Sequence, residues 1–429
     1  MTSSWITRED IEFESPEAKQ AYRERAQRIL DAIQLKTPDR IPFWFQDLGY
    51  FPCKYTGITF EKAAYDPEAW FGANKKVLLD FKPDMFFNPA YTIRGSGQAY
   101  EALGTKYMKW PGHGVSPNSP HQYVEGEYMK ADEYDAFIND MSDYVMRTFL
   151  PRVYGALEPF SSLPSISSLG LGLPGTSEIL LRPEIQSAFR AIHQAGIESM
   201  KWSKAAGAFL KEMNSLGFPV LIGSAALIPF DMISDQFRGM RGSMLDMYRC
   251  PEKLHRAMER VLPMSINMAL SGARRTGNPG VFIAVHRGAD GFMSTKQFET
   301  FYWPGFRKLA LTLIEEDLIP CVFFEGNCTS RLEYLRDLPK GKILGFFENT
   351  DIHKAKERLG DVMCMAGFMP LSILQVGTPD QVKDHAKELI DVLGKGGGYI
   401  MGPKSIMDEA NPELVRVWVD FTKEYGVRV

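Results

Sequence analysis

The sequence predicts an α/β protein built as a (β/α)8 TIM barrel, and three observations support this. Short apolar runs rich in β-branched and aromatic residues alternate with segments whose apolar residues recur at helical spacing. Several of these runs end in polar residues, as at His286, Glu325 and Glu348. A length of 429 residues suits one barrel domain with insertions. Strands that each end in polar residues indicate a site at the C-terminal ends of the strands.

Composition excludes several classes of protein. With 45% hydrophobic and 24% charged residues, the chain resembles a soluble globular protein that buries a sizeable core. The net charge of −4 gives no reason to expect nucleic-acid binding. Because no apolar run is long enough to span a membrane and the start lacks a signal-like segment, we expect a cytoplasmic location and no membrane association. The five cysteines lack paired spacings and are expected to be reduced thiols.

The elements follow one another as the barrel requires. Residues 15–35 form an amphipathic helix that opens at Ser15-Pro16 and belongs to an N-terminal helical extension over 1–38. We expect the whole chain, 1–429, to be a single domain. Expected strands cover 40–45, 84–87, 219–223, 281–285, 320–324, 342–347, 361–366 and 398–401, and expected helices cover 60–81, 131–160, 183–215, 251–273, 295–318 and 411–425.

Two stretches depart from the alternation. Residues 88–130 break into short glycine-containing pieces and predict an inserted loop region, part of which could form a lid. Farther on, Gly170, Gly172 and Gly175 match the spacing of a dinucleotide-binding fingerprint. Pro174 lies inside that fingerprint and no ribose-binding acid follows a neighbouring strand, so nucleotide binding is disfavoured.

The stretch from 320 to 367 concentrates the candidate chemistry. It holds three of the five cysteines, and its first strand ends by delivering Glu325 to a loop. By our count Glu325 follows the sixth strand and Cys364 closes the eighth, while Cys328 follows Glu325 by three residues. These three side chains could converge on one metal ion at the barrel mouth. The alternative is that Cys328 is an incidental loop residue and Cys364 a small buried hydrophobe.

Motifs spread over nearly the whole chain resemble the uroporphyrinogen decarboxylase superfamily. They are Asp39-Arg-Ile-Pro42, Tyr302 with Pro304, Gly377-Thr-Pro379, and Gly396-Gly-Gly398 ahead of Asn411. The superfamily contains the haem-pathway decarboxylase and corrinoid-dependent methyltransferases. The segment that corresponds to the arginine motif of the decarboxylase, residues 43–50, contains no arginine. The likeness is therefore to the methyltransferase branch.

Within that branch the sequence resembles the methyltransferase component of anaerobic aryl-ether O-demethylases. Thiol methyltransferases carry a His-x-Cys zinc pair where this chain reads Phe323-Phe-Glu325, and Pro403 stands near the place of their late cysteine. The O-demethylase likeness implies zinc held by one Glu and two Cys, which Glu325, Cys328 and Cys364 match in type and order. It also implies that a separate corrinoid (cobalamin) protein accepts the methyl group, and it allows a homodimer.

The implied reaction is transfer of a methyl group from a methyl ether, expected to be a methoxylated aromatic, to Co(I) of the corrinoid. Zinc would stabilise the departing oxygen as a Lewis acid. His286 could protonate that oxygen or hydrogen-bond the substrate, and a structural histidine is the alternative. Asp231, Arg287 and Glu348 are candidate substrate-binding residues.

Two other functions remain open at this stage. One is a decarboxylase that acts on a smaller carboxylated substrate with the same barrel, which would need no corrinoid. The other is a corrinoid- or tetrapyrrole-binding protein without catalytic activity. Asp84, which begins a strand, and Cys321, which lies low on its strand, are expected to be structural.

Overall fold

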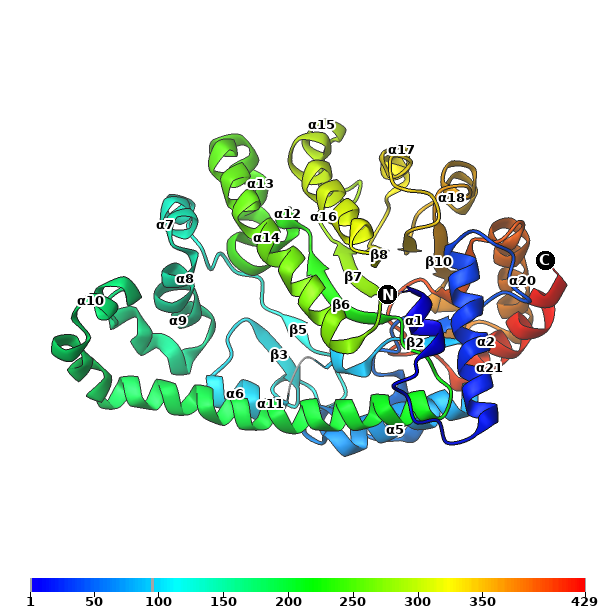
Figure 1. Cartoon of the computed structure of the whole chain (residues 1–429), viewed down its shortest axis with the longest axis horizontal. Helices are drawn as coiled ribbons and strands as arrows, with labels where there is room; N and C mark the ends of the chain where they lie inside the picture. The colour runs from blue at the N-terminus through cyan, green and yellow to red at the C-terminus, as the bar shows by residue number, and fades with distance from the viewer. Residues whose placement is uncertain (1, 94–95, 429) are drawn as a thin grey trace.

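The computed structural model describes residues 2–93 and 96–428 and contains eight parallel strands in one hydrogen-bonded order (Figure 1). Six of them form a sheet in the order β11-β10-β9-β8-β7-β6, and β1 pairs in parallel with β2. A parallel bridge between Phe43 and Met401 joins β1 to β11. The strands are β1 (Trp44–Phe45), β2 (Met85–Phe86), β6 (Ile222–Leu227), β7 (Gly280–Val285), β8 (Ile319–Phe324), β9 (Leu344–Phe347), β10 (Cys364–Met369) and β11 (Tyr399–Pro403). The predicted (β/α)8 class is confirmed.

The structure corrects the strand count near the candidate site. Strand β8, which ends just before Glu325, is the fifth barrel strand rather than the sixth, and β10 is the seventh rather than the eighth. Cys364 also begins its strand instead of closing it. Since neighbouring parallel strands end at the same edge of the sheet, this one difference moves Cys364 to the opposite end of the barrel from Glu325.

Helices surround the strands, as the helical periodicity predicts. Their bounds are α1 (Thr2–Thr7), α2 (Pro16–Ile33), α3 (Phe51–Thr56), α4 (Phe60–Tyr65), α5 (Pro67–Phe81), α6 (Gly97–Leu103), α7 (Tyr134–Asn139), α8 (Met141–Tyr144), α9 (Leu150–Val153), α10 (Ile166–Thr176), α11 (Pro183–Ser215), α12 (Pro229–Asp231), α13 (Gly239–Arg249), α14 (Pro251–Thr276), α15 (Thr295–Gln297), α16 (Trp303–Glu315), α17 (Leu332–Leu335), α18 (Ile352–Leu359), α19 (Leu371–Val376), α20 (Pro379–Leu389) and α21 (Pro412–Tyr425). Within the described ranges, no helix is both long and apolar enough to cross a membrane.

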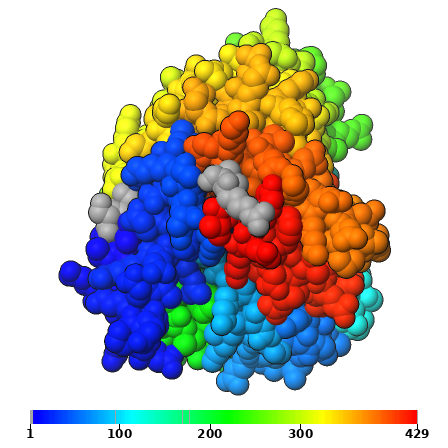
Figure 2. Space-filling model, turned by 90° about the vertical axis from the view of Figure 1, so that its right-hand side faces the viewer, coloured from blue at the N-terminus to red at the C-terminus, as the bar shows by residue number. Residues whose placement is uncertain are grey.

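The N-terminal extension closes the N-terminal end of the barrel. Ser15 caps α2 by accepting a hydrogen bond from the Ala18 N–H. Trp5 packs into the same apolar cluster as the first residues of several strands, and its indole N–H donates to the Val220 carbonyl over 2.8 Å. The N-terminal segment and the C-terminal segment lie side by side on one face of the molecule (Figure 2). Asp84 is fully buried and pairs with Arg28 and Arg40, so its structural role is confirmed.

The insertion between β2 and β6 includes the predicted 88–130 region and continues well beyond it. A small sheet of β3 (Met108–Pro111), β4 (Gly114–Val115) and β5 (Gln122–Tyr123) is followed by helices α7 to α10. The 33-residue helix α11 then runs back toward the barrel, so that α7 to α10 form an arm at the opposite end from the termini (Figure 1). Gly170, Gly172 and Gly175 lie inside α10. A dinucleotide-binding fingerprint requires a turn between a strand and a helix, so these glycines do not form one.

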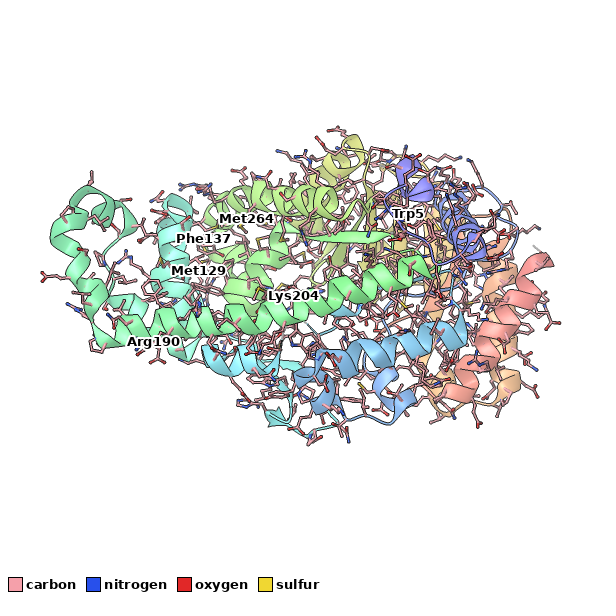
Figure 3. The ribbon with its side chains drawn as sticks, turned by 60° about the horizontal axis from the view of Figure 1, so that its bottom comes forward. Trp5, Met129, Phe137, Arg190, Lys204 and Met264 are labelled. Atoms are coloured by element: carbon pink, nitrogen blue, oxygen red, sulfur yellow. The ribbon has the colours of Figure 1, made fainter. Side chains whose placement is uncertain are left out.

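The root of the arm packs against the turn that follows β6. Met129 and Phe137 are fully buried and lie at this junction, far from Trp5 (Figure 3). The Met129 N–H donates to the Phe237 carbonyl over 2.7 Å, and the rings of Phe137 and Phe237 are 4.9 Å apart. The buried Arg238 guanidinium pairs with Asp246 at 2.6 Å. These contacts fix the turn Met232–Arg238, which follows α12.

Candidate active site at the barrel mouth

Three strand ends bring polar side chains together at the barrel mouth. Val285, Phe324 and Phe347 are in register on β7, β8 and β9, and they belong to the outer core between strands and helices. Because side chains alternate along a strand, the residues that follow them point toward the barrel axis. These residues are His286, Glu325 and Glu348. The sequence predicted that these three residues follow strand ends, although it numbered the strands wrongly.

His286 lies at the centre of a chain of acidic contacts. Its Nδ1 is 2.5 Å from Asp235 Oδ2, and its Nε2 is 3.5 Å from Glu325 Oε2. The side chain of Glu325 is 52% exposed, whereas those of His286 and Asp235 are 33% and 17% exposed. The imidazole is therefore held from behind by Asp235 and directs Nε2 toward the open mouth.

The surrounding carboxylates keep His286 protonated near neutral pH. Burial is the largest single influence and lowers the pKa of the imidazole. The hydrogen bond to Asp235, together with the negative charges of Asp231, Asp235 and Glu325, outweighs burial and raises the pKa of His286 to about 9. A protonated imidazole at an open site can donate a proton to a substrate atom.

Asp231 supports the site from below, and its predicted contact with substrate remains a prediction. The residue is fully buried, and its carboxylate accepts hydrogen bonds from the backbone N–H groups of His286 and Arg287 over 3.0 and 2.9 Å. The Tyr302 hydroxyl donates to the same carboxylate over 2.5 Å. Burial raises the pKa of Asp231, and the nearby His286 opposes this. Asp231 therefore positions the turn after β7.

Arg287 and Glu348 lie at the mouth, and their predicted substrate contacts remain predictions. The Arg287 guanidinium is 3.2 Å from Asp235 Oδ1 and donates to Ser234 Oγ over 3.1 Å. The carboxylate of Glu348 accepts the Gly326 N–H over 2.6 Å. Gly326 has φ +72°, a left-handed conformation that suits glycine, and this turn brings its N–H to Glu348. Arg287 and Glu348 both form contacts with other residues of the protein, and both are half-buried.

Cys364 is not near the mouth, so the predicted ligand set of Glu325, Cys328 and Cys364 is wrong. Cys364 is fully buried in the barrel interior, in register with Leu344 and, one strand further, with Cys321. Glu325 follows β8 four residues beyond Cys321, which corresponds to about 13 Å along the strand. Burial, with Cys321 nearby, raises the pKa of the Cys364 thiol well above its usual range. Cys364 and Cys321 are core residues.

Cys328 lies next to Glu325 at the site, but like Cys364 it is fully buried. Its Sγ is 3.9 Å from the Glu325 carbonyl oxygen, and its backbone N–H donates to Thr350 Oγ1 over 3.2 Å. Burial raises the pKa of this thiol to about 12. Within residues 2–93 and 96–428 no three His, Cys, Asp or Glu side chains are grouped to hold a metal ion. The residues present do not fit the implied zinc site.

Sequence reasoning missed two residues that organise the site. Asp235 lies on the π-helical turn Met232–Arg238 and Tyr302 on the π-helical turn Phe298–Tyr302. Such turns shift the helical register by one residue and are frequent at functional sites. Asp231 and Asp235 are four residues apart and follow a predicted strand, and this spacing could have indicated Asp235 as a site residue. Tyr302 was noted only as part of a family motif.

Comparison with known proteins agrees with this architecture. A family model described as uroporphyrinogen decarboxylase (URO-D) matches residues 183–425. The uroporphyrinogen decarboxylase of Chlorobium phaeobacteroides is 25% identical over 181 residues, which cover 39% of this chain and 51% of that protein. That of Chlorobaculum parvum is 23% identical over 197 residues, with coverages of 42% and 52%. The chain thus spans about half the length of the curated relatives it matches.

A solved structure extends the likeness beyond the residues that the family model matches. A methyltransferase from Methanosarcina mazei superimposes with a TM-score of 0.59 and 14% identity, covering 93% of this chain and 98% of that one. At this identity the likeness shows the fold. Since the family model matches more than half of the chain, the protein belongs to the uroporphyrinogen decarboxylase (URO-D) family.

Proposed function

We propose that this protein is a methyltransferase that moves a methyl group from a methyl ether, expected to be a methoxylated aromatic, to the Co(I) of a corrinoid carried by a separate protein. The observation that carries the proposal is the Asp235–His286–Glu325 chain at the barrel mouth. An ether oxygen that loses its methyl group keeps the bonding electron pair and needs a proton. His286, held protonated by its acidic neighbours, is suited to donate it from Nε2.

Each side chain at the mouth has a distinct part in this reaction. The partner's Co(I) supplies the electron pair that forms the new bond to the methyl carbon as the carbon–oxygen bond breaks. Asp235 fixes the imidazole through Nδ1 and stabilises its positive charge. Glu325 is exposed beside Nε2 and can accept a hydrogen bond from a second polar group of the donor. No step runs through zinc, because the implied ligands are not assembled.

A decarboxylase of a smaller carboxylated substrate is the second candidate, and the family match favours keeping it. The curated relatives carry the name uroporphyrinogen decarboxylase. Arg287 is a cation at the mouth that could bind a carboxylate, but Asp235 already pairs with it at 3.2 Å.

An anaerobic assay tests the proposal. The protein is incubated with Co(I) cobalamin and, in separate reactions, methoxyarenes, methanol, methylamines and thiols, and the methylated corrinoid is followed by absorbance. We expect methylation from methoxyarenes that His286→Phe abolishes. Absence of methylated corrinoid with every donor, or release of carbon dioxide from a carboxylated substrate without corrinoid, would overturn the proposal.

A further inference from the structure

The end of the arm exposes a group of apolar side chains, which we call the arm tip. Ile166, Leu171 and Leu173 on α10 and Leu181 in the turn after it are 52%, 93%, 50% and 69% exposed. Residues 159–177 contain no charged residue. Monomeric proteins rarely leave such a group uncovered, and an exposed apolar patch marks a contact with another molecule.

A separate small core holds the arm tip in place. It consists of Leu157, Phe160, Leu163, Ile185 and Ala188, against which Ile179 and Leu180 pack. Because Ile185 and Ala188 belong to α11, the tip and the first turns of this helix form one packed unit. The family model begins at residue 183, so the tip lies outside the residues that it matches. Its exposure is a property of the insertion.

A groove of about 490 Å³, which we call the root groove, lies where the arm joins α14. Met264 on α14 lies beside the root of the arm (Figure 3). Met264 and Met268 are 41% and 46% exposed, and methionine adapts its shape to an apolar partner. The groove is lined by Met141 on α8 and by one face of α14, which presents Arg260, Pro263, Met264, Asn267, Met268 and Ser271.

The arm tip and the root groove carry complementary charges. In the described part of the chain, Arg260 is the one charged residue that lines the groove, and its exposed side chain forms no hydrogen bond or ion pair. Glu178 is the first charged residue after the uncharged stretch 159–177, and its exposed side chain also has no such contact within the described ranges. A tip that lies in the groove can therefore pair Glu178 with Arg260.

The arm tip cannot fill the root groove of its own chain. The groove lies at the root of the arm, whereas α10 lies at the far end of it (Figure 1). A second copy of the chain can supply the tip. A stable interface buries about 800 Å² on each side, and four side chains in one groove cover less than this. In a twofold arrangement each copy contributes both its tip and its groove, which doubles the buried area.

We propose that two copies of this chain associate by a twofold exchange of arms, in which the arm tip of each copy lies in the root groove of the other. In this dimer Glu178 of each copy forms an ion pair with Arg260 of the partner subunit. The apolar side chains of the tip then lie against Met264 and Met268 instead of water. None of these residues belongs to the site at the barrel mouth, so the dimer does not depend on the proposed reaction.

Analytical ultracentrifugation of the full chain over a wide range of concentrations tests this dimer. We expect wild type to sediment as a dimer. Leu171→Glu places a charge in the apolar contact and should raise the dissociation constant of the dimer at least tenfold. Val376→Glu is the matched control, because Val376 on α19 is 81% exposed and lies outside both surfaces, and it should leave the dissociation constant unchanged.

A charge exchange tests the proposed ion pair. Glu178→Arg and Arg260→Glu should each weaken the dimer at least tenfold, because each brings two like charges together. The double variant restores opposite charges and should associate more tightly than either single variant. Lys383→Glu, at an exposed position on α20, changes the net charge as Arg260→Glu does and should have no effect.

Three outcomes would overturn the exchange of arms. The first is a wild type that stays monomeric at every concentration, including one that instead co-sediments with phosphatidylcholine vesicles, which would assign the arm tip to a lipid surface. The second is a Leu171→Glu dimer as tight as that of wild type. The third is a double variant that associates no more tightly than Glu178→Arg or Arg260→Glu alone.

Discussion

Asp235 Oδ2 lies 2.5 Å from Nδ1 of His286, although the two residues belong to different βα units. Asp235 comes from the π-helical turn after β6, and His286 comes directly after β7. The buried Asp231 carboxylate accepts the backbone N–H of His286 and so holds the imidazole against Asp235. This arrangement leaves Nε2 directed at the barrel mouth, and the first three predictions depend on it.

Asp235→Asn should lower the pKa of His286 from about 9 toward its ordinary value, because the amide removes the hydrogen-bonded negative charge. The pKa is measured from the pH dependence of the imidazole NMR signals. Asp391→Asn, which alters a surface pair with Lys387, serves as the control and should leave it unchanged. An unchanged pKa in Asp235→Asn would contradict the role assigned to Asp235.

The His286–Asp235 pair should also make stability depend on pH. The folded-state pKa of about 9 lies above the ordinary pKa of 6.5, so the pair contributes fully below about pH 6.5, and its contribution is lost as the pH rises through about 9. Urea unfolding of wild type and Asp235→Asn should therefore differ more at pH 6 than at pH 9.5. If the difference in unfolding free energy between wild type and Asp235→Asn instead grew as the pH rises, this pH dependence would be contradicted. In the methyl-transfer assay, the rate should fall above the same pKa.

Glu325→Gln should reduce methyl transfer by about 10²-fold, because the substituted side chain no longer offers a charged acceptor beside Nε2. Folding should be unaffected, since the side chain is 52% exposed. Initial rates are compared with those of Glu409→Gln, an exposed glutamate paired with Lys54. Equal rates for the two variants would remove Glu325 from the site.

Tyr302→Phe should destabilise the fold by about 1–3 kcal/mol, because it leaves a fully buried carboxylate of Asp231 short of one donor. Tyr334→Phe is the matched control, since the Tyr334 hydroxyl donates to Glu299 at an exposed position. The free energy of unfolding in urea should change by less than ~0.5 kcal/mol in this control. Similar losses in both variants would argue against the support role of Tyr302.

Cys364→Ala should leave the zinc content of anaerobically purified protein unchanged, because Cys364 is buried at the far end of the barrel from Glu325. The variant loses a buried sulfur atom and should cost about 1 kcal/mol of stability. Metal content is measured by mass spectrometry beside Glu325→Ala and Cys328→Ala. Loss of stoichiometric zinc from a natively folded Cys364→Ala would restore the ligand set that the sequence implied.

Periodicity alone was enough to place most elements. The predicted helix 183–215 coincides with α11, and the predicted strands at 281–285 and 320–324 differ from β7 and β8 by a single residue. Strands buried on both faces read as apolar runs whose ends are marked by polar residues, which is why His286, Glu325 and Glu348 could be named in advance. The strand near Cys364 was placed too early, because the apolar run extends past this residue to Met369.

The sequence by itself determined the barrel, its family and the strand ends that carry chemistry, since these follow from local hydrophobic periodicity and motif residues. Only the tertiary structure decided which side chains meet. Asp235 reaches His286 across 51 residues, and Tyr302 reaches Asp231 across 71. Because β10 begins at Cys364 instead of ending near it, Cys364 lies at the other end of the barrel from the site. Contacts of this kind depend on strand register and on the direction in which each side chain points, and local hydrophobic periodicity does not fix the register closely enough to predict them.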